Sequence, residues 1–173
     1  MKYIIFLCCL FALEVHAQKT FDLVSPDGTL NTTVSISDKL TYDIRCNGNL
    51  ILSPSSLSMT LDDGTVWGKQ PRLLRASRKT VDEKVPSPFY RQSEMRNHYN
   101  ALTLEFKKGW SVEFRAYNDG IVYRFTSYID KPFNIMNEEV AYTFPENFKV
   151  NASYVVPRIK DGSLESQFYN SFE

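Results

Sequence analysis

Two acidic pairs, Glu138-Glu139 and Asp62-Asp63, are the residues of this sequence whose types and spacing first suggest chemistry. Two neighbouring carboxyl groups can act as general acid and general base, provided that both reach the same reacting group. Glu138 and Glu139 lie in a stretch that predicts a strand, where adjacent side chains point to opposite faces. Asp62 and Asp63 precede a glycine in a predicted turn, where both carboxylates face water. We therefore expect both pairs to be solvated charges at strand ends.

Histidine and cysteine offer little to a metal site or to covalent catalysis. His98 is the only histidine after residue 17, and its polar neighbours predict a loop position rather than a ligand. Cys46 is the only cysteine after residue 17, so no intrachain disulfide can form there. Because Cys46 lies on an apolar stripe with no histidine nearby in sequence, we expect a small buried hydrophobe rather than a nucleophile.

A local positive run lies within residues 67–88, a stretch whose prolines limit helix and which we expect to be extended and looped. The run consists of Arg72, Arg75, Arg78 and Lys79. A charge run of this size is usually a solvated face of a protein. A phosphate or sulfate site is the alternative, although no glycine-rich cradle accompanies the run.

Trp67, Trp110 and the tyrosines could act as platforms on which sugar rings stack. Trp110 is the candidate for sugar stacking, because it follows the turn Lys108-Gly109, where a platform could stand clear of a sheet. The alternative, which we favour, is that Trp110 covers one end of the core, since most tryptophans are largely buried.

Residues 112–125, VEFRAYNDGIVYRF, alternate apolar and polar side chains on both sides of an Asn-Asp-Gly turn, which predicts a β-hairpin. A two-residue turn would place Arg115 opposite Arg124, an unfavourable pairing of like charges. A four-residue loop at residues 117–120 instead places Glu113 opposite Arg124. We prefer this loop because it pairs opposite charges.

The charged face of the hairpin is expected to hold the strands in register rather than to react. Its structural residues are Glu113, Arg115, Asp119, Gly120 and Arg124. No catalytic, cofactor-binding or metal-binding residue is assigned to the chain.

Residues 1–17 have the three parts of a secretory signal peptide, namely a lysine, an apolar run and Val15-His16-Ala17 before the cut. The apolar run is too short to span a bilayer, which takes roughly 20 residues. We expect a secreted or periplasmic protein that begins at Gln18, with residues 18–173 in one domain. The formal net charge of zero provides no field that attracts nucleic acid or an anionic membrane.

The remaining residues predict short strands separated by turns. A period of two residues recurs in residues 30–36, 40–46 and 102–106, and the first two of these stretches begin a meander. Residues 53–56, Ser-Pro-Ser-Ser, are expected to interrupt the pattern before residues 57–61 resume it. Roughly ten strands at intervals of about 8 to 12 residues predict an all-β antiparallel sandwich of two sheets.

The closing residues 162–173 are rich in aromatic side chains, including Phe168, Tyr169 and Phe172. Such a composition predicts burial against a part of the polypeptide that follows. We therefore expect these 173 residues to be the front piece of a longer protein.

Several stretches together resemble a known family. They are Ser25-Pro26-Asp27-Gly28, the meander with Leu40-Thr41-Tyr42 and Asn47-Gly48, residues 57–61, and FRAYNDGIVYRF at residues 114–125. With these features, most of the chain after residue 17 resembles the N-terminal domain of family 97 glycoside hydrolases. The resemblance implies a galactose-mutarotase-like β-supersandwich, truncated here before its end, that precedes a (β/α)8 catalytic barrel. It also implies a secreted or periplasmic bacterial enzyme that cleaves α-glucosides or α-galactosides.

The resemblance places the chemistry of such enzymes outside this chain. In that family the barrel carries the catalytic carboxylates, and a calcium ion at the sugar site is held mainly by barrel glutamates with one glutamate from the N-terminal domain. That glutamate lies in an Ile/Ser-Glu-Ala type of motif, which this sequence does not contain. We expect calcium in the full-length enzyme but assign no ligand here.

Three functions remain as hypotheses. The first is a non-catalytic domain that supports the barrel of an α-glycoside hydrolase acting on α-linked oligosaccharides, with retention or inversion. The second is a free-standing secreted carbohydrate-binding module. The third, a mutarotase-like epimerase, needs histidine and carboxylate partners, and the single histidine after residue 17 counts against it.

Overall fold

The computed structural model describes residues 18–88, 91, 93–149, 153–155 and 170–172, and these residues form strands joined by turns and loops. The strands are β1 (Lys19–Val24), β2 (Leu30–Ile36), β3 (Leu40–Cys46), β4 (Asn49–Leu61), β5 (Val66–Trp67), β6 (Leu73–Pro86), β7 (Glu94–Phe106), β8 (Trp110–Ala116), β9 (Ile121–Ser127), β10 (Ile135–Val140), β11 (Ser153–Val155) and β12 (Asn170–Phe172). Within these ranges no helix has the length and apolarity needed to cross a membrane.

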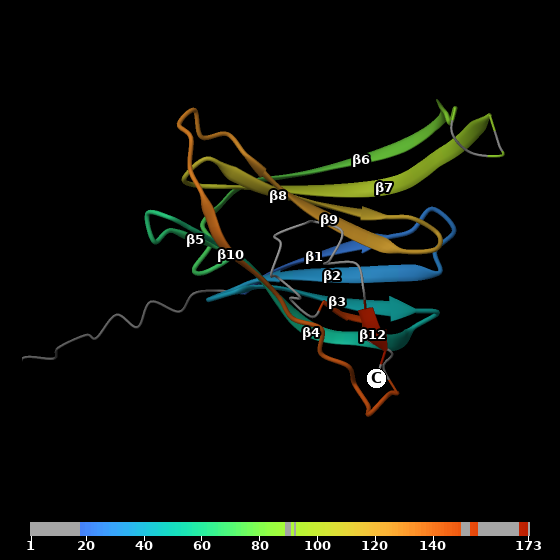
Figure 1. Ribbon diagram of the computed structural model, residues 1–173. Coiled ribbons are helices and arrows are strands. Elements are labelled where there is room, and N and C mark those ends of the chain that lie inside the picture. The colour runs from blue at the N-terminus through green and yellow to red at the C-terminus, as the bar shows by residue number, and fades with distance from the viewer. Residues whose placement is uncertain (1–17, 89–90, 92, 150–152, 156–169, 173) are drawn as a thin grey trace, which may run out of the picture.

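The strands form two main antiparallel sheets that lie face to face (Figure 1). The larger sheet has six strands, in the order β1-β2-β3-β4-β10 with β5 paired to β4. The smaller sheet has four strands, in the chain order β6-β7-β8-β9. A separate antiparallel pair joins β11 to β12. The predicted all-β antiparallel sandwich is confirmed, and so is the meander through β2, β3 and β4.

The core lies between the two sheets, because successive strand residues point alternately into and out of the sandwich. Leu40 and Leu57 of the larger sheet, and Leu102 and Phe114 of the smaller one, are fully buried. The Tyr42 ring spans the two layers, with its centroid 5.8 Å from that of Phe114. Burying a side chain of this size stabilises the fold by about 1.5–3 kcal/mol. The two-residue periodicity therefore specifies the sandwich.

The predicted interruption at residues 53–56 is wrong. Strand β4 continues through this stretch for 13 residues. Its pairing with β3 shifts in register between Tyr42 and Ile44, which creates a bulge in the part of β4 that contains Pro54. A bulge accommodates a residue that has no N–H to donate, so the proline bends the strand without ending it.

Residues 67–88 are extended as predicted, but the prediction that they are looped is wrong for most of the stretch. Strand β6 has 14 residues and pairs with β7 along its length. Strand β8 pairs with β7 only from Asn100 onward, so residues 94–99 extend past the sandwich with β6 as their partner (Figure 1). His98 lies in this extension of β7 rather than in the predicted loop. Because both faces of the extension are largely exposed, its sequence lacks the apolar alternation of a core strand.

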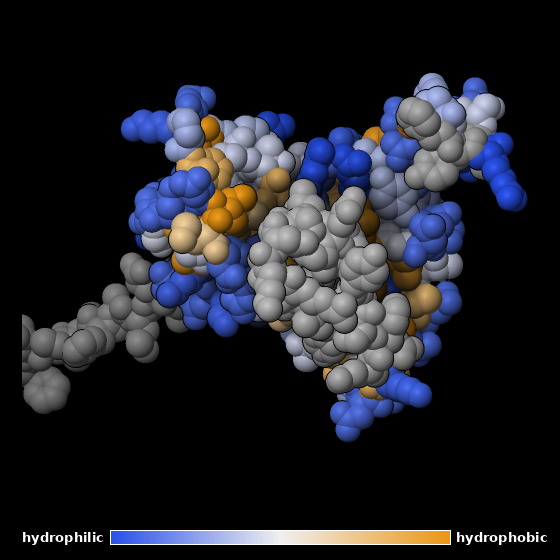
Figure 2. All heavy atoms as spheres, in the orientation of Figure 1, coloured by the Kyte–Doolittle hydropathy of each residue, from blue (hydrophilic) through white to orange (hydrophobic). Residues whose placement is uncertain are grey.

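Apolar side chains also reach the surface at the edges of the sheets. Figure 2 shows them over the start of β10, where Ile135 and Met136 are 55% and 67% exposed. On β9, the other edge strand, Tyr123 and Phe125 pack against the core but are only half-buried. The sandwich is therefore less enclosed at its β9 and β10 edges than at its centre.

Some sequence predictions concern residues at the margins of the described structure. The predicted signal peptide, residues 1–17, lies outside the described residues, as do Phe168 and Tyr169 of the aromatic closing segment. Cys46 ends β3 and is half-buried, which is less enclosed than predicted, because it lies beside the turn at the end of the sheet.

Candidate functional site

The β8–β9 hairpin has the four-residue loop favoured by the charge argument. Glu113 lies opposite Arg124, and residues 117–120 form the loop. The first N–H of the loop donates to the carbonyl of its last residue at 2.9 Å. Arg115 faces Val122, so the like-charge pairing of the two-residue alternative does not occur.

Glu113 is the centre of an ionic cluster on the outer face of the smaller sheet, formed with Arg115, Arg124 and Lys79. The Glu113 side chain is only 9% exposed. Its Oε1 lies 2.7 Å from Nε and Nη2 of Arg115 and 3.2 Å from Nη2 of Arg124. Its Oε2 lies 3.6 Å from Nζ of Lys79. Since these cations come from β6, β8 and β9, the cluster connects the strands on both sides of the sheet centre.

Burial and charge oppose each other in setting the pKa of Glu113. Burial by itself raises this pKa, because removal from water disfavours the carboxylate. The hydrogen bond and charge of Arg115 lower it, as do the charges of Lys79 and Arg124, and together they hold the pKa below its ordinary value of 4.5. Glu113 is therefore an anion that binds three cations and is unsuited to the role of a general acid.

Two members of this site, Lys79 and Tyr99, were missed by the sequence analysis. Lys79 belongs to the basic run, but the pairing of β6 with β7 places it opposite Ala101, beside the ionic cluster. The guanidinium carbon of Arg115 lies 4.6 Å from the centre of the Tyr99 ring, a cation–π contact. A two-residue periodicity assigned to β6 would have placed Lys79 on the outer face of the sheet.

Asp119 and Gly120 lie in the loop, apart from the ionic cluster. The ion pairs of the described residues do not involve Asp119. The loop is instead held by Asn118, whose Oδ1 accepts a hydrogen bond from the Asp27 N–H at 3.1 Å. This bond connects the hairpin tip to the β1–β2 turn, and no pattern in the sequence predicts it.

The basic run does not form a single site. Arg78 donates to the Asp22 carbonyl at 2.8 Å on the side of β1, whereas Lys79 belongs to the ionic cluster on the outer face. Arg72 lies before β6 in a separate hollow. The alternation of side chains along β6 divides the run between two faces of the sheet.

Both acidic pairs accept hydrogen bonds at the surface. Glu139 accepts a hydrogen bond from the Ser58 hydroxyl at 3.2 Å. Asp63 accepts one at 2.8 Å from the backbone N–H two residues further on. All four carboxylates are exposed, in keeping with solvated charges at strand ends.

Trp110 lies in the core and is only 3% exposed. Its ring is stacked against Trp67, with centroids 5.6 Å apart and planes 7° apart. It is also stacked against Phe106, with centroids 4.1 Å apart and planes 16° apart. A sugar ring could stack on Trp110 only if this aromatic stack opened.

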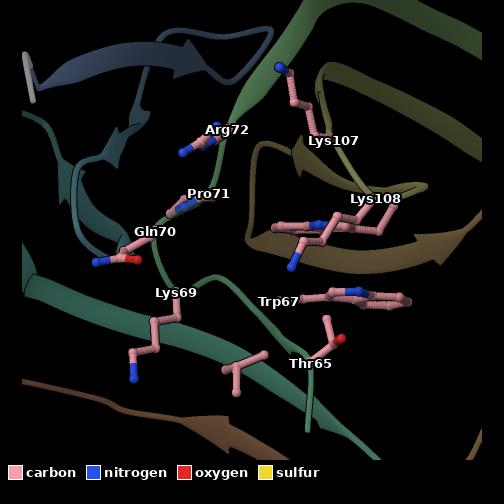
Figure 3. A pocket seen from close by; sticks show the side chains of 10 residues that line it. Thr65, Trp67, Lys69, Gln70, Pro71, Arg72, Lys107 and Lys108 are labelled. Carbon is pink, nitrogen blue, oxygen red and sulfur yellow. The ribbon is translucent and has the colours of Figure 1, made fainter. Parts of the chain in front are cut away.

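A hollow of about 400 Å³ lies beside the two tryptophans. Figure 3 shows it between two loops, residues 68–72 before β6 and residues 107–109 between β7 and β8. Its lining includes Trp67, Trp110, Lys69, Arg72, Lys107 and Lys108. The lining thus combines two buried tryptophans with four cationic residues, and Figure 3 shows Lys108 next to the indole rings while Lys69 and Lys107 extend away from them.

Backbone contacts fix the two loops relative to each other. The Lys107 N–H donates to the Arg72 carbonyl at 2.9 Å, and the Gln70 N–H donates to the Asp38 carbonyl at 2.7 Å. Gly68 has a φ of +90°, and a Cβ at this position would lie 2.2 Å from the Leu57 carbonyl oxygen. The shape of the hollow therefore depends on backbone packing as well as on its side chains.

The described residues contain no group of three or more His, Cys, Asp or Glu side chains that could hold a metal ion. Calcium requires several clustered oxygen ligands. The described part of the chain thus does not fit a calcium site, and none of its residues is assigned as a ligand.

The two-sheet architecture matches that of solved enzymes. A glycoside hydrolase family 97 enzyme in complex with acarbose, from Pseudoalteromonas sp. strain K8, has a TM-score of 0.68 at 16% identity, over 78% of this chain and 22% of that one. A beta-arabinopyranosidase has a TM-score of 0.66 at 21% identity, over the same shares. At these identities the likeness concerns the fold, which is that of an antiparallel β domain within a larger glycosidase.

The family follows from the sequence comparison. A family model described as Glycosyl-hydrolase 97 N-terminal matches residues 23–173, and the chain therefore belongs to this family. The resemblance seen in the sequence is thereby confirmed. A retaining alpha-galactosidase of Bacteroides thetaiotaomicron is 58% identical over 175 aligned residues, which cover 100% of this chain and 26% of that protein. The chain thus spans about a quarter of the length of that relative.

Proposed function

We propose that this domain supports, and partly walls, the active site of a family 97 glycoside hydrolase that cleaves α-galactosides or α-glucosides. The observation that carries the proposal is the 58% identity with a retaining alpha-galactosidase across the whole of this chain. That relative favours an α-galactoside over an α-glucoside and retention over inversion. A (β/α)8 barrel elsewhere in the full-length polypeptide performs the reaction.

The chemistry of glycoside hydrolysis supports this division of labour. A retaining enzyme needs two carboxyl groups about 5 Å apart across the scissile bond. In this domain the buried carboxylate of Glu113 is paired with three cations, and both acidic pairs are exposed. These carboxylates have structural partners and no shared reaction centre, which supports a non-catalytic role.

The ionic cluster and the hairpin suit a domain that must keep its shape beside an active site. Cross-strand ion pairs around Glu113 connect three strands, and the Asn118–Asp27 contact connects the hairpin tip to the other sheet. A rigid wall positions substrate without contributing reacting groups.

The proposal also includes export of the enzyme and calcium binding by the full-length polypeptide. Residues 1–17 direct the enzyme to the periplasm or the exterior, and calcium binds to the full-length enzyme through ligands outside the described residues. Calcium removal by EDTA is then expected to reduce turnover of the full-length enzyme, and added calcium is expected to restore it. Turnover that EDTA leaves unchanged would remove calcium from the proposal.

The function is tested with the full-length enzyme, assayed against 4-nitrophenyl α-galactopyranoside and α-glucopyranoside. The expected result is preference for the galactoside, with the α-anomer as the first product seen by proton NMR. Residues 18–173 alone, prepared in parallel, are expected to hydrolyse neither substrate. Hydrolysis by this fragment, or a full-length enzyme inactive on both substrates, would overturn the proposal.

The binding-module hypothesis lacks a comparable observation. Its candidate platform, Trp110, is 3% exposed and stacked against two other rings. We therefore do not advance it as a second function.

A further inference from the structure

Cationic side chains gather at one end of the sandwich, around two neighbouring hollows. The hollow beside the tryptophans, of about 400 Å³, shares Pro71, Arg72 and Lys107 with a second hollow of about 310 Å³. The cations that line one hollow or both are Lys19, Lys69, Arg72, Lys107 and Lys108. Among the described residues, no aspartate or glutamate lines either hollow. We refer to the two hollows together as the cationic groove.

This concentration of positive charge contrasts with the formal net charge of zero of the whole chain. The ion pairs among the described residues involve none of the five cations. The pKa of Asp63 is lowered mainly by hydrogen bonds from Thr65, with a smaller effect of Lys108. The cations of the groove therefore lack ion-pair partners among the described residues, and an anionic ligand would supply such partners.

The groove also offers apolar surface beside its cations. Its lining includes the half-buried Pro71 beside Trp67 and Trp110, which are 2% and 3% exposed. The Pro71 ring and the aliphatic stems of the lysines match a sugar, whose C–H groups contact this apolar surface while acidic substituents meet the cations.

The extent of the groove indicates more than one charge on the ligand. The cations line two adjacent hollows, one on either side of the hydrogen bond from the Lys107 N–H to the Arg72 carbonyl. This hydrogen bond fixes the separation of the two hollows. A single small oxyanion would fill one hollow and leave the other unpaired. We propose that the cationic groove binds an anionic saccharide, a glycan segment that carries sulfate or carboxylate groups on successive rings.

Binding at the cationic groove is a separate function from the proposed hydrolysis, because it requires no turnover and concerns charged rather than neutral sugars. It can hold an acidic region of a glycan while the barrel acts on a neutral α-linked residue nearby. Failure of this inference leaves the hydrolase function standing, and failure of the hydrolase function leaves the binding measurable.

The test uses the full-length enzyme and isothermal titration calorimetry. The probes are a heparin-derived tetrasaccharide, tetragalacturonate, neutral maltotetraose and sodium sulfate. Arg72→Gln/Lys107→Gln removes the two cations shared by both hollows. Lys131→Gln/Lys149→Gln is the matched control, since it removes two exposed positive charges located elsewhere. Circular dichroism and melting temperature check that all variants fold.

We expect at least one of the two anionic tetrasaccharides to bind the wild type and neutral maltotetraose not to bind. The Arg72→Gln/Lys107→Gln variant should bind the anionic sugar about tenfold more weakly or worse, the loss expected for charge-assisted hydrogen bonds. The control variant should remain within about twofold of the wild type, as distant surface charges contribute little.

Three outcomes would overturn the proposal. Equal weakening in both double variants would indicate attraction to the overall charge rather than to the groove. Sulfate ions that bind as tightly as the saccharides would indicate a site for a free inorganic anion. A folded wild type that binds none of the anionic probes would indicate that acidic residues from the rest of the polypeptide occupy the groove.

Discussion

Glu113 is stabilised in its charged form, so its contribution to folding depends on pH. Because its pKa in the folded domain lies below the ordinary value of 4.5, its stabilising effect is present above that value and is lost as the pH falls through the folded pKa. Replacing Glu113 with Gln should lower the free energy of unfolding at pH 7 by about 1–3 kcal/mol. Urea unfolding at pH 7 and pH 3, followed by tryptophan fluorescence, measures the loss.

The acid behaviour of the same variant provides the control. Wild type should lose stability between pH 7 and pH 3, and Glu113→Gln should lose less, because the variant has no carboxylate to protonate at this position. If both proteins lose the same free energy of unfolding, protonation of Glu113 does not contribute to the pH dependence of stability.

The two arginines of the hairpin should differ in importance. Arg115 has a side chain that is 23% exposed, lies 2.7 Å from Glu113 and packs on Tyr99. Arg124 is 61% exposed and lies 3.2 Å from Glu113. Arg115→Ala should therefore cost about 2 kcal/mol of stability and Arg124→Ala about 0.5 kcal/mol, seen as unequal falls in melting temperature.

Turnover of the full-length enzyme distinguishes a structural role of these two arginines from a catalytic role. At a temperature where each variant is folded, both should retain nearly the kcat of the wild type, since neither arginine is placed among reacting groups. A large loss of kcat in Arg124→Ala without a fall in melting temperature would contradict the structural assignment.

At the scale of elements, the connection from β5 to β6 depends on Gly68. Its φ of +90° disfavours any other residue, and an added Cβ would lie 2.2 Å from the Leu57 carbonyl oxygen of β4. Gly48 is the matched control, with a φ of +81° and nothing within 4 Å of the added Cβ. Gly68→Ala should cost about 3 kcal/mol or more and Gly48→Ala about 1 kcal/mol. Equal effects in thermal unfolding would show that the backbone contact at β4 is unimportant.

Elements with one buried face were the ones that the sequence predicted well. The β8–β9 hairpin was placed in its observed register, because apolar alternation and charge pairing agreed on one loop length. Strand β6 was missed since its outer half projects from the sandwich and carries charges on both faces. The interruption at Pro54 was wrong because a bulge, which depends on the partner strand, accommodates the proline.

The candidate site was harder to predict than the fold, since it combines residues from distant parts of the chain. Glu113 and its two arginines are close in sequence and were found together. Lys79 joins them through the pairing of β6 with β7, which no local pattern encodes. The cationic groove likewise depends on how the loops before β6 and after β7 approach, here through the bond from Lys107 to Arg72.

At the scale of the whole molecule, the β9 and β10 edges face each other across a partly open side of the sandwich. Burial raises the pKa of Tyr123 on β9 to about 12, with smaller effects of Glu138 on β10 and of Tyr142, which places these groups near one another. Tyr123 is nevertheless only half-buried, and Met136 on β10 is 67% exposed. We expect other polypeptide to cover apolar surface of this kind.

The last prediction follows from that exposed surface. Residues 18–173, prepared alone, should bind the dye ANS and associate at micromolar concentrations, whereas the full-length enzyme should do neither, because its remaining residues cover the β9 and β10 edges. Dye fluorescence and analytical ultracentrifugation measure the difference. Met136→Gln should reduce dye binding by the fragment, while Thr126→Gln serves as a polar control on β9. A monomeric fragment that binds no dye would show that these edges need no cover, and the sandwich would then be an independent unit.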